Sequence, residues 1–174
     1  MNRMHTGLKG ACWIAVWLGL AGVAVRAQAE GNIDTANKFA WSEAAGWLNF
    51  APTHGGVTVL LEKSGYLSGY AWAENIGWIK LGSDAGGPYA NTGADDWGVN
   101  LNEGALSGFA WSETCGWINF SPTHGQVTVN VISGEFDGYA WSENLGWIHF
   151  RNDTPSYGVR TLARYPAGSV FILH

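Results

Sequence analysis

The sequence predicts an all-β protein built from four copies of one short unit. A twelve-residue motif recurs four times, large and small side chains alternate within it, and helical periodicity is absent after residue 29. Each copy carries two tryptophans six residues apart, and the motif is too long and too often repeated to arise by chance. The copies are FAWSEAAGWLNF at 39–50, YAWAENIGWIKL at 70–81, FAWSETCGWINF at 109–120 and YAWSENLGWIHF at 139–150.

Each unit is expected to form about three short antiparallel strands. In the first strand Tyr70 and Trp72 fall on one face and Ala71 on the other, because strand side chains alternate. The Ser/Ala-Glu-x-x-Gly segment is typical of a turn, in which the glycine supplies a positive φ. Trp-Ile-x-Phe forms the second strand. The third is the Val-Thr-Val segment that follows, such as 57–61.

The units divide residues 30–174 into one Trp- and Gly-rich domain. We place the repeats at about 39–68, 70–107, 109–138 and 139–162, and a further apolar strand at 169–173. That last strand is expected to pair with the N-terminal strand and hide both edges of the sheet. The repeat pattern leaves four architectures open: a barrel, a sandwich, a propeller-like ring and a β-solenoid.

Residues 1–29 are predicted to be a cleaved signal peptide. Arg3 and Lys9 precede the apolar run 11–25, and Ala27-Gln28-Ala29 matches a signal-peptidase site. The run is shorter than the roughly 20 residues of a membrane-spanning helix. We therefore expect a secreted, periplasmic or surface-held protein with no transmembrane segment in the mature chain.

Composition narrows the function classes. Charged residues are only 13% and hydrophobic residues 47%, which excludes an ordinary disordered chain. The net charge of -5 argues against a nucleic-acid partner. Cys115 stands where the other copies have Ala45, Ile76 and Leu145, so it is expected to be a small buried hydrophobe.

The repeat tryptophans are expected to form the core, because each ring can bury about 150–250 Å². The alternative is that some of them stack on sugar rings at the surface. The candidate binding residues under that alternative are Trp41, Trp72, Trp111, Trp141, Tyr70, Tyr139 and Trp97.

The charged and polar residues of the motif favour structure over catalysis. Four equivalent glutamates in equivalent turns give no distinct acid and base, so we expect them to accept hydrogen bonds from turn amides or indole N–H groups. His54 and His124 occupy a slot that holds Trp97 and Tyr157 in the other copies, which indicates a need for a flat ring. No residue is assigned a catalytic role. The four glutamates are Glu43, Glu74, Glu113 and Glu143.

The segment 82–96 is the strongest departure from the repeat. Asp84, Asp95 and Asp96 offer hard oxygen ligands of the kind that Ca²⁺ prefers, without the spacing of an EF-hand. The plainer alternative is a solvated loop. Insertions in repeat proteins often carry binding function, so we expect any specificity to lie there.

The unit GYAWSENxGWIxF with its PTHG tail resembles Trp-rich repeats of uncharacterised secreted or surface proteins of bacteria, over nearly all of residues 36–162. The resemblance implies an extracellular or envelope address and no particular activity. We expect a non-enzymatic structural or surface-binding protein whose partners are polysaccharides or other surface proteins. The alternatives are a carbohydrate-binding module and, less favoured, a glycan-active enzyme.

Overall fold

The computed structural model describes residues 31–165, which form thirteen antiparallel strands and no helix. The predicted all-β class is confirmed. With no helix in this part of the chain, none is long and apolar enough to cross a membrane. The strands are β1 (Ile33–Ser42), β2 (Gly46–Asn49), β3 (Gly56–Leu60), β4 (Gly65–Ala73), β5 (Gly77–Lys80), β6 (Val99–Asn102), β7 (Ala105–Ser112), β8 (Gly116–Asn119), β9 (Val127–Val129), β10 (Phe136–Ser142), β11 (Gly146–His149), β12 (Arg151–Asp153) and β13 (Ser156–Thr161).

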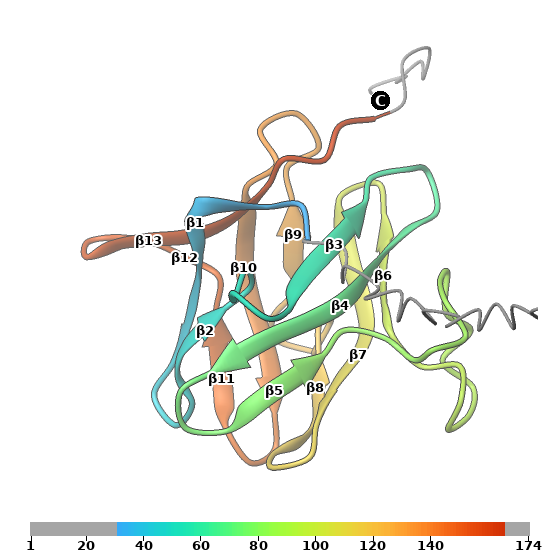
Figure 1. Ribbon diagram of the computed structural model, residues 1–174, viewed down its shortest axis with the longest axis horizontal. Coiled ribbons are helices and arrows are strands. Elements are labelled where there is room, and N and C mark those ends of the chain that lie inside the picture. Colours follow the sequence, from blue (N-terminus) through green and yellow to red (C-terminus); the bar gives the residue numbers. More distant parts are fainter. Residues whose placement is uncertain (1–30, 166–174) are drawn as a thin grey trace, which may run out of the picture.

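Eight of these strands close into a barrel, which decides among the four architectures left open by the sequence (Figure 1). Their order is β1-β2-β4-β5-β7-β8-β10-β11, and β11 pairs with β1 through His149 and Trp41. Each copy of the motif supplies one hairpin of this ring. The glycine that starts each second strand has a φ of 72–79°, as the turn prediction requires, at Gly46, Gly77, Gly116 and Gly146.

The hairpins join with a constant offset. Within the first hairpin Phe39 faces Asn49, and Asn49 in turn faces Trp72 of the next copy. Phe39 corresponds to Tyr70 in the motif, so the register moves two residues at this junction. The same offset recurs at the other three junctions, where Lys80 faces Trp111, Asn119 faces Trp141 and His149 faces Trp41. Repeated offsets tilt the strands, as closure of a barrel demands.

The remaining strands form a second tier on the same long strands. The first half of β4 pairs with β3 and β6, and its second half pairs with β2 and β5. A glycine with a φ near 90° marks the change at Gly69, Gly108 and Gly138. At Gly138 the backbone lies so close to Gln126 that a Cβ would stand 1.9 Å from its carbonyl oxygen. Only glycine fits such a contact.

The core is formed by the small-residue face of the motif, and the expectation that the repeat tryptophans form it is wrong. Phe150 lies at the centre, with ring centroids 5.4 Å from Phe50, 5.6 Å from Phe120 and 6.0 Å from Phe136. The equivalent position of the second copy is Leu81, which is also fully buried. The motif alanines Ala40, Ala71, Ala110 and Ala140 are fully buried as well, and Val57, Val59 and Leu61 face inward as predicted.

The first long strand, β1, pairs with the last strand, β13, within residues 31–165. The backbone N–H of Leu162 also donates to the carbonyl of Asn32. The expected strand 169–173 and the predicted signal peptide 1–29 lie outside the described residues. β12 and β13 form a hairpin that projects from the barrel at the left of Figure 1.

An ion pair between Asp34 and Arg160 links β1 to β13. Asp34 of β1 accepts hydrogen bonds from Nε of Arg160 of β13 at 2.9 Å and from the backbone N–H of Ala36. The Ala36 N–H, the Arg160 guanidinium and the Asn37 amide together lower the pKa of Asp34 from 3.8 to about 2. A lowered carboxyl pKa stabilises the fold above the unfolded value and loses that contribution as pH falls through the folded one.

We therefore expect the difference in melting temperature between the wild type and Asp34→Asn to be largest above pH 4 and to shrink between pH 4 and pH 2. Circular dichroism melts at several pH values measure it. Asp153→Asn is the control, because it removes an exposed carboxylate that lies 3.8 Å from Arg151. Its melting temperature should stay close to that of the wild type at every pH. A difference for Asp34→Asn that stays constant down to pH 2 would contradict the assigned cause.

Candidate aromatic binding surface

The repeat tryptophans all lie on the outer face of the barrel. Trp41, Trp72, Trp78, Trp117 and Trp147 keep 36–46% of their surface exposed, and Trp47, Trp111 and Trp141 are half-buried. The alternation that buries Ala71 and Ile79 turns Trp72 and Trp78 outward. Neighbouring exposed aromatic side chains of this kind are typical of a binding surface.

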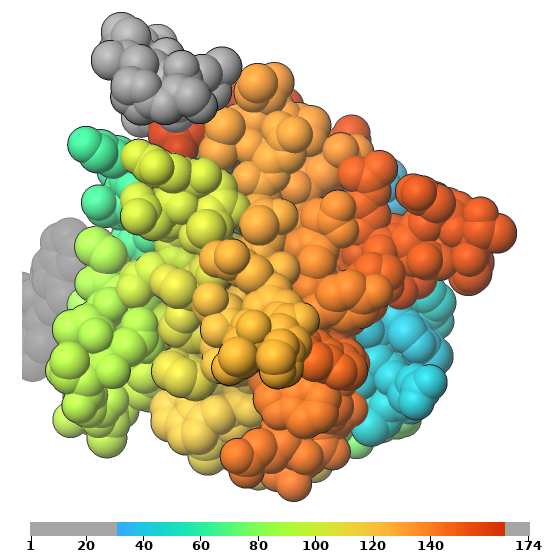
Figure 2. All heavy atoms as spheres, turned by 180° about the vertical axis from the view of Figure 1, so that it is seen from behind, coloured from blue at the N-terminus to red at the C-terminus, as the bar shows by residue number. Residues whose placement is uncertain are grey.

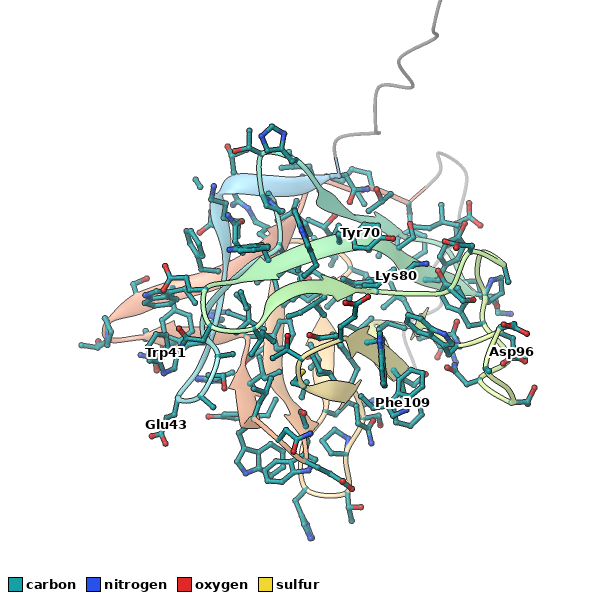
Figure 3. All side chains as sticks on the ribbon, turned by 60° about the horizontal axis from the view of Figure 1, so that its bottom comes forward. Trp41, Glu43, Tyr70, Lys80, Asp96 and Phe109 are labelled. Atoms are coloured by element: carbon teal, nitrogen blue, oxygen red, sulfur yellow. The ribbon has the colours of Figure 1, made fainter. Side chains whose placement is uncertain are left out.

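Strand register arranges the outer side chains in four rows that run around the barrel. Each row reads aromatic, polar, first Trp, second Trp, and it crosses from one copy to the next. Row 1 is Phe39, Asn49, Trp72, Trp78; row 2 is Tyr70, Lys80, Trp111, Trp117; row 3 is Phe109, Asn119, Trp141, Trp147; row 4 is Tyr139, His149, Trp41, Trp47. Figure 3 shows the start of row 2, where Tyr70 and Lys80 lie side by side.

Edge-to-face contacts hold the rings in place. The two tryptophans of each copy have centroids 4.6–4.9 Å apart with interplanar angles of 62–74°. The first aromatic of each motif adds an edge contact to the second tryptophan, as Tyr70 does to Trp78 at 6.2 Å. Such pairs favour fixed orientations, so each cluster is preorganised.

Two of the junctions between copies form open grooves. The groove between the second and third copies, groove 2–3, has a volume of about 870 Å³ and combines row 2 residues with His54 and Glu113. The groove between the third and fourth copies, groove 3–4, has a volume of about 740 Å³ and includes Trp97, Asn119 and Glu143. Each groove thus places carboxylate and polar side chains between tryptophans.

The tail of one copy reaches the second tryptophan of the next. Trp97 meets Trp117 edge-on at 5.3 Å, and Tyr157 meets Trp47 in the same way at 5.1 Å. In the other two tails a glycine lies against the second tryptophan of the next copy, Gly55 against Trp78 and Gly125 against Trp147. The sequence slot that accepts His, Trp or Tyr therefore lies beside the aromatic rows.

The polar positions of the rows differ in charge. In row 2, a hydrogen bond from Lys80 to Asp84, 2.6 Å long, raises the pKa of the Lys80 ammonium, and burial opposes this. In row 4, His149 stacks on Tyr139 with centroids 4.2 Å apart, and its Nδ1 lies 3.0 Å from the Tyr157 hydroxyl. Burial lowers the pKa of His149, so its uncharged form is favoured.

The motif glutamates lie exposed in the turns at the end of the barrel, with Glu43 seen there in Figure 3. Within residues 31–165 none of the four accepts a hydrogen bond, so the expected contacts with turn amides or indoles are not formed. Instead, the amide of Asn75 donates to the carbonyl of Ala44, and that of Asn144 to the carbonyl of Cys115. These two bonds tie the turns of adjacent copies together.

The acidic segment does not gather its carboxylates. Asp84 pairs with Lys80, and Asp96 accepts hydrogen bonds from Thr92 and Gly93 at the exposed end of the loop (Figure 3). Asp95 is exposed. No cluster of three or more potential metal-ligating His, Cys, Asp or Glu residues occurs between residues 31 and 165, which gives the calcium hypothesis no support.

The candidate aromatic residues predicted from the sequence all belong to this surface. Trp41, Trp72, Trp111 and Trp141 hold the same place in the four rows, Tyr70 and Tyr139 begin two of them, and Trp97 lines groove 3–4. Cys115 is buried, as expected, and burial raises the pKa of its thiol.

Sequence reasoning missed the second tryptophans and the polar position of each row. Asn49, Lys80, Asn119 and His149 share the face of the tryptophans by simple alternation in Trp-Ile-x-Phe. They also vary between copies while their neighbours repeat, and this variation is the sequence signal that could have identified them.

No family model, curated protein or solved structure matches this chain.

Proposed function

We propose that the protein is a non-enzymatic binding protein that holds polysaccharide chains on its outer aromatic rows. The observation that carries the proposal is the fourfold recurrence of exposed tryptophans with a polar side chain between rings. Aromatic ring faces attract the C–H faces of sugars because the ring face carries partial negative charge. Adjacent polar groups can bond to the hydroxyls and fix the orientation of the sugar.

The spacing of each row suits a sugar chain. The first aromatic and the first Trp stand two strands apart, which is about 10 Å at the usual spacing between strands. This is close to the length of a disaccharide in a β-1,4-linked chain. Four rows on one rigid barrel would raise avidity for a polymer that reaches more than one row.

Residues 1–29 support placing this activity outside the cytoplasm. A basic start, an apolar run and the Ala27-Gln28-Ala29 site are the features of a signal peptide. Cleavage would remove Arg3, Lys9 and Arg26 and change the net charge from -5 to -8. The N-terminal sequence of the exported protein tests the site of cleavage.

The test of binding is retention of the purified barrel on insoluble cellulose, chitin and peptidoglycan, with tryptophan fluorescence titrations against soluble fragments of each. We expect saturable binding to at least one glycan and a loss of ~10-fold or more in affinity for the double variant Trp72→Ala/Trp141→Ala, as for central aromatic anchors elsewhere.

Ile132→Ala is the matched control, because Ile132 is an exposed apolar side chain outside the four rows. It should bind as the wild type does. Circular dichroism confirms that each variant is folded. Absence of binding to every glycan, or equal loss in the Ile132 variant, would overturn the proposal.

A further inference from the structure

The four rows are alike in plan, but residues of the insertion after the second copy line only one of the two grooves. Residues 82–98 run along the side of the barrel beside the third copy, as the yellow-green ridge in Figure 2. Asn91, Thr92, Gly93 and Trp97 of this segment line groove 3–4. The other described groove has the short His54 tail in the same place.

Internal contacts hold the insertion in one conformation. Tyr89 is buried, and its hydroxyl donates to the carbonyl of Leu67 at 3.1 Å. Asn100 bonds to both backbone groups of Tyr89, at 2.8 and 2.7 Å. The Asn91 side chain accepts from the Gly98 N–H, and Asp96 caps the tip. A wall fixed in this way costs little entropy when a ligand binds.

Groove 3–4 also differs in charge from groove 2–3. Among residues 31–165, its polar lining consists of the amides of Asn91, Asn119 and Asn144, the Thr92 hydroxyl and the Glu143 carboxylate, with no lysine, arginine or histidine. Groove 2–3 carries Lys80 and His54 beside Glu113. A carboxylate without a cation disfavours an acidic sugar, and amides suit uncharged hydroxyl or acetamido groups.

Resting on the proposed function, we infer that groove 3–4 is the principal site and that it selects a segment of uncharged sugars. The insertion supplies a second wall, so a sugar in this groove lies against Trp97 and against the tryptophans of the third and fourth copies that line it. The remaining rows act as auxiliary contacts along the same polymer.

Asn119 and Asn49 provide a matched pair for the test. They hold the same place in rows 3 and 1, and each accepts a 2.9 Å hydrogen bond from the backbone N–H two residues on. Asn119→Lys and Asn49→Lys therefore lose the same turn contact and gain the same charge. Only Asn119→Lys alters the groove with the wall.

The experiment titrates the wild type and both variants with cellotetraose, chitotetraose and tetragalacturonate by calorimetry. We expect the wild type to prefer an uncharged tetrasaccharide over tetragalacturonate. Asn119→Lys should weaken that binding ~10-fold and Asn49→Lys by ~2-fold or less. Trp97→Ala should weaken it as well, and by more than Tyr157→Ala, the equivalent change in the fourth copy.

The outcomes separate the two proposals. Equal effects of the two lysine variants, or tighter wild-type binding of tetragalacturonate, would overturn the inference about groove 3–4 and leave glycan binding standing. A wild type that binds none of the tetrasaccharides and none of the insoluble glycans would overturn both.

Discussion

Replacing Phe150 by alanine is expected to lower the free energy of unfolding by about 3–5 kcal/mol, the usual cost of removing a buried phenylalanine. Its ring contacts those of Phe50, Phe120 and Phe136, which come from three other places in the chain. The side chain is 1% exposed, so the variant leaves a cavity at the point where the copies meet. Urea unfolding followed by circular dichroism measures the loss.

Phe150→Leu is the internal control, because Leu81 fills the same position of the second copy. Leucine keeps more of the buried apolar volume than alanine does, so this variant should cost less, about 1–2 kcal/mol. Ile132→Ala, at an 81% exposed side chain, should leave stability unchanged. A Phe150→Ala variant as stable as the leucine variant would refute the central packing described for this ring.

The second large effect is expected at the bend of β10. Gly138→Ala should destabilise the protein by about 2–4 kcal/mol, since it adds the strain of a positive φ to a steric clash. The φ of Gly138 is 90°, and an added Cβ would stand 1.9 Å from a backbone oxygen, which no side-chain rotation relieves. Urea unfolding reports the change.

Gly158→Ala serves as the comparison. Gly158 also lies in a strand, but its φ is not positive and an added Cβ meets nothing closer than 3.8 Å. That variant should be as stable as the wild type or slightly more stable, because alanine restricts the unfolded chain. Equal destabilisation by the two variants would show that the bend at Gly138 is not the cause.

The local features of the fold follow from the sequence, because they depend on residues close together in the chain. Alternation placed Ala71 opposite Trp72, and the turn glycines have the positive φ that their position predicted. The choice of a barrel did not follow, since it depends on the two-residue offset between copies and on the pairing of His149 with Trp41. No motif within one copy encodes that pairing.

The core was misassigned because side-chain size alone favoured the tryptophan face. An eight-stranded barrel has an interior just wide enough for side chains to fill. Alanine, isoleucine and phenylalanine fill it layer by layer, and rings as large as tryptophan on every strand would not fit beside them. The larger aromatic face is therefore turned outward, where it forms the candidate site.

The candidate site was predicted in part. The first tryptophans and Trp97 were named, but the polar members of the rows emerge only from register across copies, as with Lys80 opposite Trp111. The insertion was expected to carry specificity, and it places Asn91 and Trp97 in the lining of groove 3–4. The calcium ligands proposed for its aspartates have no support among the described residues.

The pairing of the last copy with the first sets a limit on how such a chain can evolve. An open array of repeats can gain or lose a unit at little cost, because its ends are free. Here a fifth copy would have to break the bond between β11 and β1 and widen the ring to ten strands around a core sized for eight. Closure of the barrel thus fixes the number of copies at four. Sequence change is tolerated mainly at the outward-facing positions and in the loops between copies.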